Sequence, residues 1–229
     1  MSKNILMVGA SGLVGSNILE LLEDGDSKIT LLLRRKLEDK AYLKQIISEF
    51  NNIVKPDEMN SIDEVYIAIG KKLSLFELIY LKKKDRKDFE TVDFDYIKNA
   101  ALFAKHCGAK SIALVSAIGA NDKSSNIYLN VKGKIEKEII SLGFNKVVIA
   151  QPSHLLGKRP DEQTNYLISV FEKITNILGN LMIGPLKKYR NISAAQVAKS
   201  LVSKMSSDDD GVYVPVSYTH LRAHETKAN

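Results

Sequence analysis

The sequence is poor in cysteine and tryptophan, and it lacks any apolar run long enough to cross a membrane. It has one cysteine, Cys107, and no tryptophan. A lone cysteine cannot form a disulfide within the chain, and no group of cysteines and histidines has the spacing of a structural metal site. A bilayer span needs roughly 20 apolar residues, and the first residues show none of the regions of an export signal. We therefore expect a cytoplasmic protein without a metal and without an integral membrane segment.

The charge is modestly basic and no recognition motif accompanies it. The 33 Lys and Arg residues outnumber the 27 Asp and Glu residues, which gives a net charge of +6. This balance suits an ordinary solvated surface, so a nucleic-acid partner is not expected. The densest basic stretch covers residues 71–87, where lysines flank the apolar segment 73–81. Two interpretations of it stay open: a loop whose apolar side faces the core, and a short interfacial helix or lid.

Strands and helices alternate along the first 150 residues. Short apolar runs predict buried strands at 4–8, 28–33, 64–69, 111–115 and 146–150. Apolar residues at helical spacing predict helices at 13–23, 42–50, 88–107 and 128–142. Strands separated by helices predict an α/β Rossmann fold, a doubly wound and mostly parallel sheet with helices on both faces.

A glycine-rich turn follows the first strand and opens the first helix. Glycines in this setting allow a tight turn, a close approach of the backbone to a pyrophosphate, and close packing of helix on strand. The helix N-terminus offers N–H groups and the positive end of its dipole to the phosphates. The GxxGxxG spacing alone is a weak signal, but its place between strand and helix is the context that the motif requires. The predicted dinucleotide-binding residues of this turn are Gly9, Ser11, Gly12, Leu13, Val14 and Gly15.

The end of the second strand indicates which dinucleotide is bound. Arg34 and Arg35 follow this strand, and no acidic residue occurs before Glu38. An acidic residue there would accept a hydrogen bond from the ribose 2′-hydroxyl of NAD, whereas a guanidinium binds a 2′-phosphate. The sequence therefore favours NADP(H) over NAD(H). We also expect Ile69 and Gly70, where the third strand ends, to contact the cofactor.

A tyrosine and a lysine four residues apart lie near the start of the helix predicted at 128–142. Tyr128 and Lys132 share one helical face, and the preceding strand ends next to Ser116. About one such pair is expected by chance, so the position carries more weight than the pattern. A nearby lysine is expected to lower the pKa of the phenol and so suit it to exchange protons with a carbonyl or alcohol. We predict all three residues as catalytic and in contact with the cofactor, with Ser116 holding the carbonyl oxygen.

Together these motifs resemble the atypical short-chain dehydrogenase/reductases. More narrowly, residues 29–37, 123–133 and 151–157 resemble the Tat-interacting-protein-like oxidoreductases. The resemblance implies an NAD(P)H-dependent oxidoreductase that transfers hydride to a small carbonyl substrate, with Pro152 and Ser153 beside the nicotinamide. One departure is Val92-Asp93 in the helix predicted at 88–107, because related reductases often carry asparagine there. The alternative is an NADP(H)-binding regulatory or scaffold protein with little or no turnover, since a member of the group is discussed in that role.

The alternation ends after residue 152. Residues 1–152 are predicted to form the NAD(P)-binding core, and residues 153–215 a substrate-side region of the same domain with helices at 165–178 and 194–205. Residues 216–229 break from this pattern and resemble a translated sequencing adapter, which predicts a non-native tail. His220 and His224 in that tail have helical metal-pair spacing, but we do not expect them to bind a metal.

Overall fold

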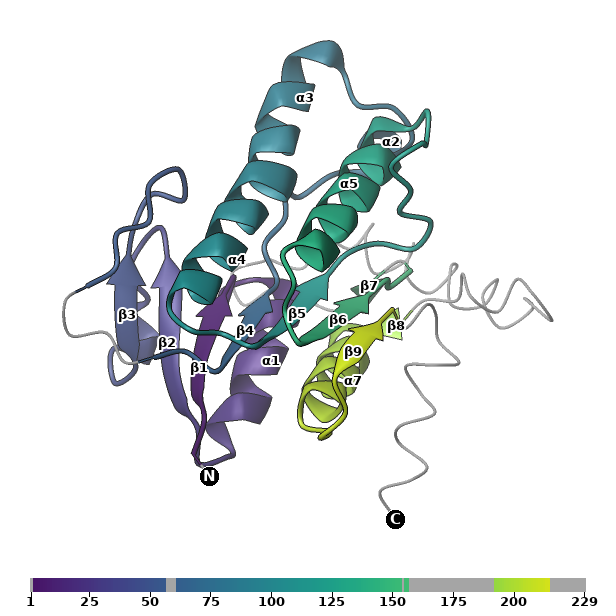
Figure 1. Cartoon of the computed structure of the whole chain (residues 1–229). Helices are drawn as coiled ribbons and strands as arrows, with labels where there is room; N and C mark the ends of the chain where they lie inside the picture. The colour runs from purple at the N-terminus through teal and green to yellow at the C-terminus, as the bar shows by residue number, and fades with distance from the viewer. Residues whose placement is uncertain (1, 57–60, 154, 157–191, 215–229) are drawn as a thin grey trace.

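Seven parallel strands form the centre of the molecule (Figure 1). The computed structural model describes residues 2–56, 61–153, 155–156 and 192–214. The sheet order is β3-β2-β1-β4-β5-β6-β9, and every neighbouring pair is parallel. The strands are β1 (Asn4–Val8), β2 (Lys28–Leu33), β3 (Lys44–Ile47), β4 (Glu64–Ile67), β5 (Ser111–Val115), β6 (Lys146–Ala150) and β9 (Gly211–Tyr213). This order confirms the predicted doubly wound Rossmann fold.

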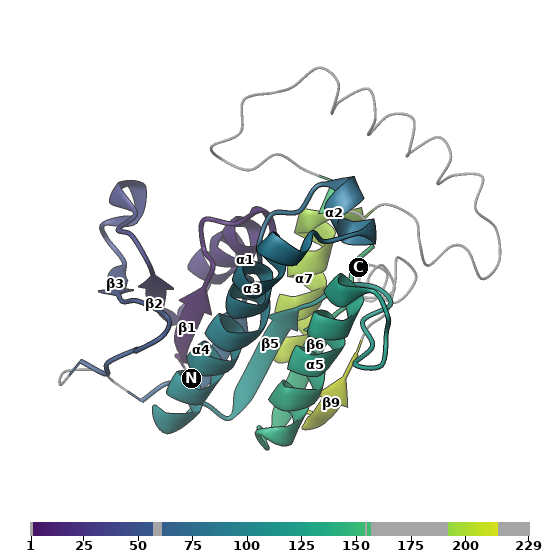
Figure 2. The same ribbon diagram turned by 90° about the horizontal axis from the view of Figure 1, so that it is seen from above.

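Helices cover both faces of the sheet, as Figure 2 shows from above. One layer holds α1 (Leu13–Glu23) and α7 (Ala194–Met205), which pack on each other. The other layer holds α3 (Lys83–Glu90), η2 (Thr91–Asp95), α4 (Tyr96–His106) and α5 (Ile127–Ser141). The short elements are η1 (Glu38–Lys40), α2 (Leu75–Ile79), β7 (Leu155–Leu156) and β8 (Ile192–Ser193). Among the residues that the structure describes, no helix combines the length and apolarity needed to cross a membrane.

The sheet has a hydrophobic core on each of its faces, because successive side chains of a strand point to opposite faces. In β1, Leu6 and Val8 enter the core beneath α4 and α5, whereas Ile5 and Met7 enter the core beneath α1 and α7. All four are nearly inaccessible to solvent. Burial on both faces explains why this strand reads as a continuous apolar run rather than as an alternating one.

The predicted helix at 42–50 is wrong. Lys44–Ile47 instead form β3, the edge strand that pairs with β2 from Thr30 to Leu33. Apolar residues at 43, 46, 47 and 50 fit helical spacing, and so short a run does not distinguish helix from strand. Pairing with β2 satisfies the backbone groups of a segment that buries only Ile46 in the strand.

The predicted helices and strands elsewhere are confirmed to within a few residues. The helix predicted at 88–107 is the end of one helical run formed by α3, η2 and α4. In its middle, η2 is a π-helix that carries Asp93 into the interior, where the residue is 1% exposed. The helix predicted at 194–205 is α7. The helix predicted at 165–178, the tail from 216 and most of the region 153–215 lie outside the described residues.

The basic stretch 71–87 follows neither interpretation fully. Leu81 is buried against Phe89, which agrees with an apolar side toward the core. Phe76, Ile79 and Tyr80, however, are 86%, 77% and 64% exposed on and beside the short helix α2. Because this apolar segment faces mainly outward, the interpretation as a core-covering loop is wrong for its centre.

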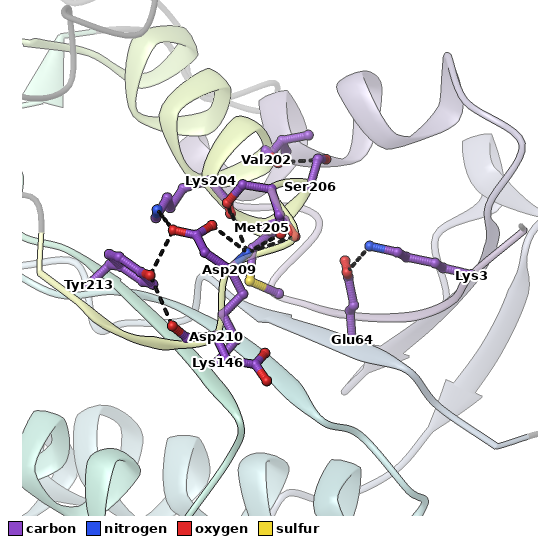
Figure 3. Close-up of polar contacts among 11 residues, drawn as sticks. Lys3, Glu64, Lys146, Val202, Lys204, Met205, Ser206, Asp209, Asp210 and Tyr213 are labelled. Atoms are coloured by element: carbon purple, nitrogen blue, oxygen red, sulfur yellow. Dashed lines mark hydrogen bonds and ion pairs between the residues drawn. The ribbon is translucent and has the colours of Figure 1, made fainter.

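A polar network links the start of β6, the end of α7 and the edge strand β9 (Figure 3). Lys146, the first residue of β6, has a side chain only 3% exposed. Its ammonium donates to the Ser207 carbonyl and hydroxyl and to the Met205 carbonyl at 3.4 Å, which caps the last turn of α7 with a cation. Asp209 accepts from Lys204 at 2.5 Å and from the Tyr213 hydroxyl at 2.7 Å. These contacts fasten α7 and β9 to the sheet.

Candidate functional site

Two adjoining hollows lie at the carboxyl ends of the parallel strands. The order of the chain reverses between β1 and β4, which is where ligands bind in open α/β sheets. The first hollow has a volume of about 360 Å³ and extends from the turn after β1 to Tyr128 and Lys132. The second, about 400 Å³, lies beside the residues that follow β2. They share Gly9, Ser11, Arg34, Phe50 and Ile69, so one elongated ligand can occupy both.

The turn between β1 and α1 forms a cradle that requires glycine. Gly9 has φ +89°, and a Cβ there would lie 2.7 Å from the carbonyl carbon and oxygen of Ala68. At Gly15 a Cβ would lie 1.9 Å from the Gly9 oxygen, so α1 packs directly on the turn. The first turn of α1 has no acidic residue, and its N-cap, Gly12, provides no side-chain cap. Such a helix start suits an anion, and the cradle therefore fits a dinucleotide pyrophosphate.

The basic loop after β2 is held by a side chain from β3. The Gln45 amide nitrogen donates to the carbonyls of Leu37 and Lys40, both at 2.8 Å, and its oxygen accepts from the Leu37 N–H at 3.0 Å. This fixes the chain that follows Arg34 and Arg35. Arg34 lines both hollows and Arg35 lines the second. Both side chains are exposed and available to an anion.

Lys132 forms a buried ion pair with Asp93. Its Nζ lies 2.8 Å from Asp93 Oδ1, and the two side chains are 7% and 2% exposed. Asp93 Oδ2 accepts the backbone N–H of Lys71 at 2.7 Å. The Tyr128 ring packs against Phe89 of α3 with ring centroids 5.7 Å apart. Tyr128, Lys132 and Asp93 all line the first hollow.

Lys132 acts on the pKa of Tyr128 in the expected downward direction, but burial outweighs it. Burial raises the pKa of the phenol, Lys132 opposes that effect, and the Asp93 carboxylate adds to it, so the pKa lies above its ordinary value of 10.0. Burial alone would lower the pKa of Lys132, but Asp93 and Tyr128 outweigh it and the pKa of the ammonium is raised. Lys132 therefore stays charged, and Tyr128 keeps its proton at neutral pH.

Ser116 makes a contact that the sequence interpretation missed. Its hydroxyl donates to the buried carboxylate of Glu136, which also accepts from the Gln151 amide at 3.0 and 2.9 Å. Burial raises the pKa of Glu136, and its hydrogen bonds with Ser116 and Gln151 oppose that effect. Because the Ser116 hydroxyl donates its proton to Glu136, it can offer only acceptor lone pairs to a group in the hollow. The predicted role of Ser116 as a donor to a carbonyl oxygen is not supported by this arrangement.

The structure gathers most of the predicted site residues at one edge of the sheet. Those that line the hollows are Gly9, Ser11, Gly12, Leu13, Val14, Arg34, Arg35, Ile69, Gly70, Ser116, Tyr128 and Lys132. Gly15, Pro152 and Ser153 do not line them. Pro152 is buried and its carbonyl accepts from the Ile118 N–H at 2.9 Å. The lining residues that were not predicted include Phe50, Lys71, Asp93 and Tyr96. Within the described residues, no group of three or more His, Cys, Asp or Glu side chains could hold a metal ion.

Relatives with curated descriptions share most of this chain. The protein FMP52, mitochondrial, of Candida albicans is 34% identical over 164 residues, which cover 68% of each chain. The chain belongs to the FMP52 and Tat-interacting-protein-like family. Another FMP52, from Debaryomyces hansenii, is 27% identical and aligns over 97% of both chains. The rat protein HTATIP2 is 33% identical and covers 71% of this chain and 66% of its own. No protein-family model matches the chain.

Solved structures share the fold of this FMP52-like chain at low sequence identity. MoeE5 in complex with UDP-glucose and NAD has a TM-score of 0.68 at 14% identity and covers 98% of this chain and 81% of its own. The aldohexose dehydrogenase of Thermoplasma acidophilum has a TM-score of 0.67 at 18% identity, with coverage of 93% and 91%. These likenesses confirm the Rossmann architecture.

The expected cytoplasmic location is wrong. The FMP52 relatives are described as mitochondrial, including the Debaryomyces protein that aligns over nearly the whole chain. The expectation depended on absences, and a single cysteine excludes an internal disulfide without distinguishing one reducing compartment from another.

Proposed function

We propose that this FMP52-like protein binds NADP(H) and reduces a small carbonyl compound. The observation that carries the proposal is that Tyr128 and Lys132 line the same hollow as the glycine turn between β1 and α1. A positioned acid and a dinucleotide cradle in one cavity are the two parts that carbonyl reduction requires. Among the structures with this fold, one was solved with NAD and another is named a dehydrogenase, which agrees with this class of chemistry.

Separate parts of the site would hold separate parts of the cofactor. The backbone from Gly9 to Val14 would bind the pyrophosphate, since the N-terminus of α1 points its N–H groups there. Arg34 and Arg35 would bind the 2′-phosphate, which a guanidinium can contact with two parallel hydrogen bonds. Ile69 and Gly70, which line the first hollow, are proposed to lie toward the nicotinamide.

The reduction divides between the cofactor and Tyr128. Bound NADPH supplies the hydride. Tyr128 Oη gives its proton to the carbonyl oxygen, so that the phenol O–H bond breaks as the product O–H bond forms, and solvent then restores the phenol proton. Lys132 stays charged in its pair with Asp93 and would orient the nicotinamide ribose. Ser116 presents an acceptor to the hollow, so the donor to the carbonyl oxygen is Tyr128.

Replacing Tyr128 by Phe tests this function. Loss of NADPH absorbance is measured with a panel of aldehydes and ketones, and binding of NADPH is followed separately by fluorescence. We expect Tyr128→Phe to lower kcat by about 10² to 10⁴, the usual contribution of a positioned acid. Binding of NADPH should persist because the ring and its packing on Phe89 remain. Tyr80→Phe, which removes a phenol hydroxyl from a residue 64% exposed outside the site, is the matched control and should keep the wild-type rate.

Two outcomes separate this proposal from its alternative. Wild-type turnover in Tyr128→Phe would remove the tyrosine from the mechanism. Tight NADPH binding without turnover of any carbonyl would favour an NADP(H)-binding regulatory or scaffold protein, in which the site holds the cofactor and does no chemistry.

A further inference from the structure

Asp93 pairs with Lys132, which lies one helical turn beyond Tyr128 on α5. Both of its oxygens are held, Oδ1 by Lys132 Nζ at 2.8 Å and Oδ2 by the backbone N–H of Lys71 at 2.7 Å. The π-helical turn η2 places the residue at this depth, and π-turns of this kind often occur at functional sites. The proposed reduction uses Tyr128 and Lys132 but assigns no task to this carboxylate.

A lysine paired with a carboxylate stabilises a neighbouring phenolate less than a free lysine does. The interaction between charges falls with distance, and an opposite charge 2.8 Å from the ammonium opposes the field of the ammonium at Tyr128. The surrounding charges do not restore it. Glu136 adds a carboxylate one turn beyond Lys132 on α5. On the other side, the Lys71 ammonium pairs with Asp88 of α3 at 3.6 Å.

We infer that Asp93 is a positioning residue that neutralises Lys132 and so keeps Tyr128 in its protonated form, which commits the site to giving a proton rather than taking one. The inference rests on the proposed function, because a proton donor serves reduction of a carbonyl and a phenolate base serves oxidation of an alcohol. An asparagine here would keep the contact with the Lys71 N–H but would leave the ammonium without its counter-charge. Burial raises the pKa of the phenol, and Asp93 adds to that rise against the opposing effect of Lys132, in agreement with this role.

Titration of Tyr128 in the protein without cofactor or substrate tests the inference. The chain is labelled with carbon-13 at the phenolic ring carbon of tyrosine, and the Tyr128 signal is assigned by its loss in Tyr128→Phe. In Asp93→Asn we expect the apparent pKa of Tyr128 to fall by about one unit or more, because the ammonium then acts alone. In Lys132→Met it should rise, because the carboxylate then acts alone. In the double variant it should return to within about half a unit of the wild-type value, since both charges are gone.

Asp95→Asn is the matched control. Asp95 lies two residues away in the same η2 segment with an exposed side chain, so losing its charge should leave the Tyr128 titration unchanged. An unchanged titration in Asp93→Asn, or the same shift in Asp95→Asn, would overturn the inference. Should Asp93→Asn not fold, Lys132→Met is compared with the double variant. The pKa of Tyr128 must then be lower in the double variant than in Lys132→Met. Equal pKa values in these two proteins would also overturn the inference.

This measurement is independent of turnover. If the titrations follow the expected cycle and no carbonyl is reduced, the proposed function fails while the electrostatic role of Asp93 stands. If a carbonyl is reduced, the alkaline fall of its kcat should move to lower pH in Asp93→Asn, because the acid form of Tyr128 is lost earlier. A profile that does not move, in an active enzyme, would contradict the role of Asp93 and leave the reductase function intact.

Discussion

Arg34 and Arg35 follow β2, where the proposed cofactor site would hold the 2′-phosphate that distinguishes NADP(H) from NAD(H). Arg34 borders both hollows, whereas Arg35 borders only the one beside β2. Glu38, the first acidic residue beyond them, pairs with Lys36 at 3.1 Å and lines neither hollow. No carboxylate from this loop is therefore placed to accept from a ribose 2′-hydroxyl, which supports the proposed preference for NADP(H).

Replacing either arginine by alanine should weaken NADPH binding selectively. Loss of one charge-assisted contact with the 2′-phosphate is expected to raise the Kd for NADPH by roughly tenfold to a hundredfold, with little change for NADH. Calorimetry with both cofactors measures it. Lys28→Ala removes the same charge from the opposite end of β2 and should change neither affinity. A wild-type preference for NADH, or equal losses for both cofactors, would contradict the assignment.

The residues of the site were predictable where the backbone dictates them, and less so where side chains meet. The glycine turn is readable because strand, glycines and helix are consecutive in the chain. Glu136 and Gln151 were missed, because their contact with Ser116 joins three separate elements. One signal was present: Glu136 lies four residues after Lys132, on the face that Tyr128 shares. The pair Val92-Asp93 was visible as a departure from asparagine, but the sequence did not show that Asp93, in the π-helical turn, pairs with Lys132.

At the scale of elements, the sequence predicted the buried strands better than the edge strand. A central strand buries both faces and appears as an apolar run, as Ile112–Leu114 of β5 does. The edge strand β3 buries only Ile46, so the order of its apolar residues does not distinguish a strand from a helix. Its pairing with β2 makes this segment a strand. That error mattered for the site, because Gln45 of β3 holds the loop that follows Arg34 and Arg35.

The helix α5 is seated against the loop before it by a glycine. A Cβ at Gly133 would lie 2.2 Å from the Asp122 nitrogen and 2.3 Å from the Asn121 carbonyl carbon, both of them backbone atoms. Gly133→Ala should therefore destabilise the fold by about 1 to 3 kcal/mol despite the better helix propensity of alanine. The expected fall in Tm is roughly 2 to 4 °C for each kcal/mol, measured by calorimetry.

Gly25→Ala separates crowding from a general effect of alanine. The nearest atom to a Cβ at Gly25, just beyond the end of α1, is the Leu22 oxygen at 3.7 Å, an ordinary contact. Its Tm should be unchanged or slightly higher. Because α5 carries Tyr128 and Lys132, Gly133→Ala should also weaken turnover. A stable and fully active Gly133→Ala protein would mean that the backbone of the loop before α5 shifts to make room for the added methyl group.

At the scale of the whole molecule, the candidate site and the polar network that holds α7 and β9 lie at opposite ends of the strands. The hollows lie at the carboxyl ends of the strands, whereas the network of Lys146 and Asp209 lies at the start of β6 and beside β9. The network joins α7 and β9, the last described elements of the chain, to the sheet. Changes in it should alter stability and leave the pKa of Tyr128 unaffected, since they do not touch the site.

Asp209 should make the stability of the fold depend on acid pH. Hydrogen bonds from Lys204, Ser207 and Tyr213 hold the pKa of Asp209 well below its ordinary value of 3.8. Above that value the carboxylate is charged in the folded and unfolded chains alike, and its stabilising contribution is complete. As the pH falls through and below about 4, the unfolded chain binds the proton first, so this contribution declines.

Comparison of wild type with Asp209→Asn isolates that contribution from the other carboxylates of the chain. We expect a higher Tm for the wild type near neutral pH and a difference that narrows steadily as the pH is lowered from about 5 toward 2. Scanning calorimetry across this range measures it. Asp208→Asn removes an equal charge from the neighbouring exposed residue and should follow the wild type throughout. A Tm difference that stays constant with pH would mean that Asp209 stabilises the fold by packing or backbone conformation, because only a change in proton affinity between the two states produces a narrowing gap.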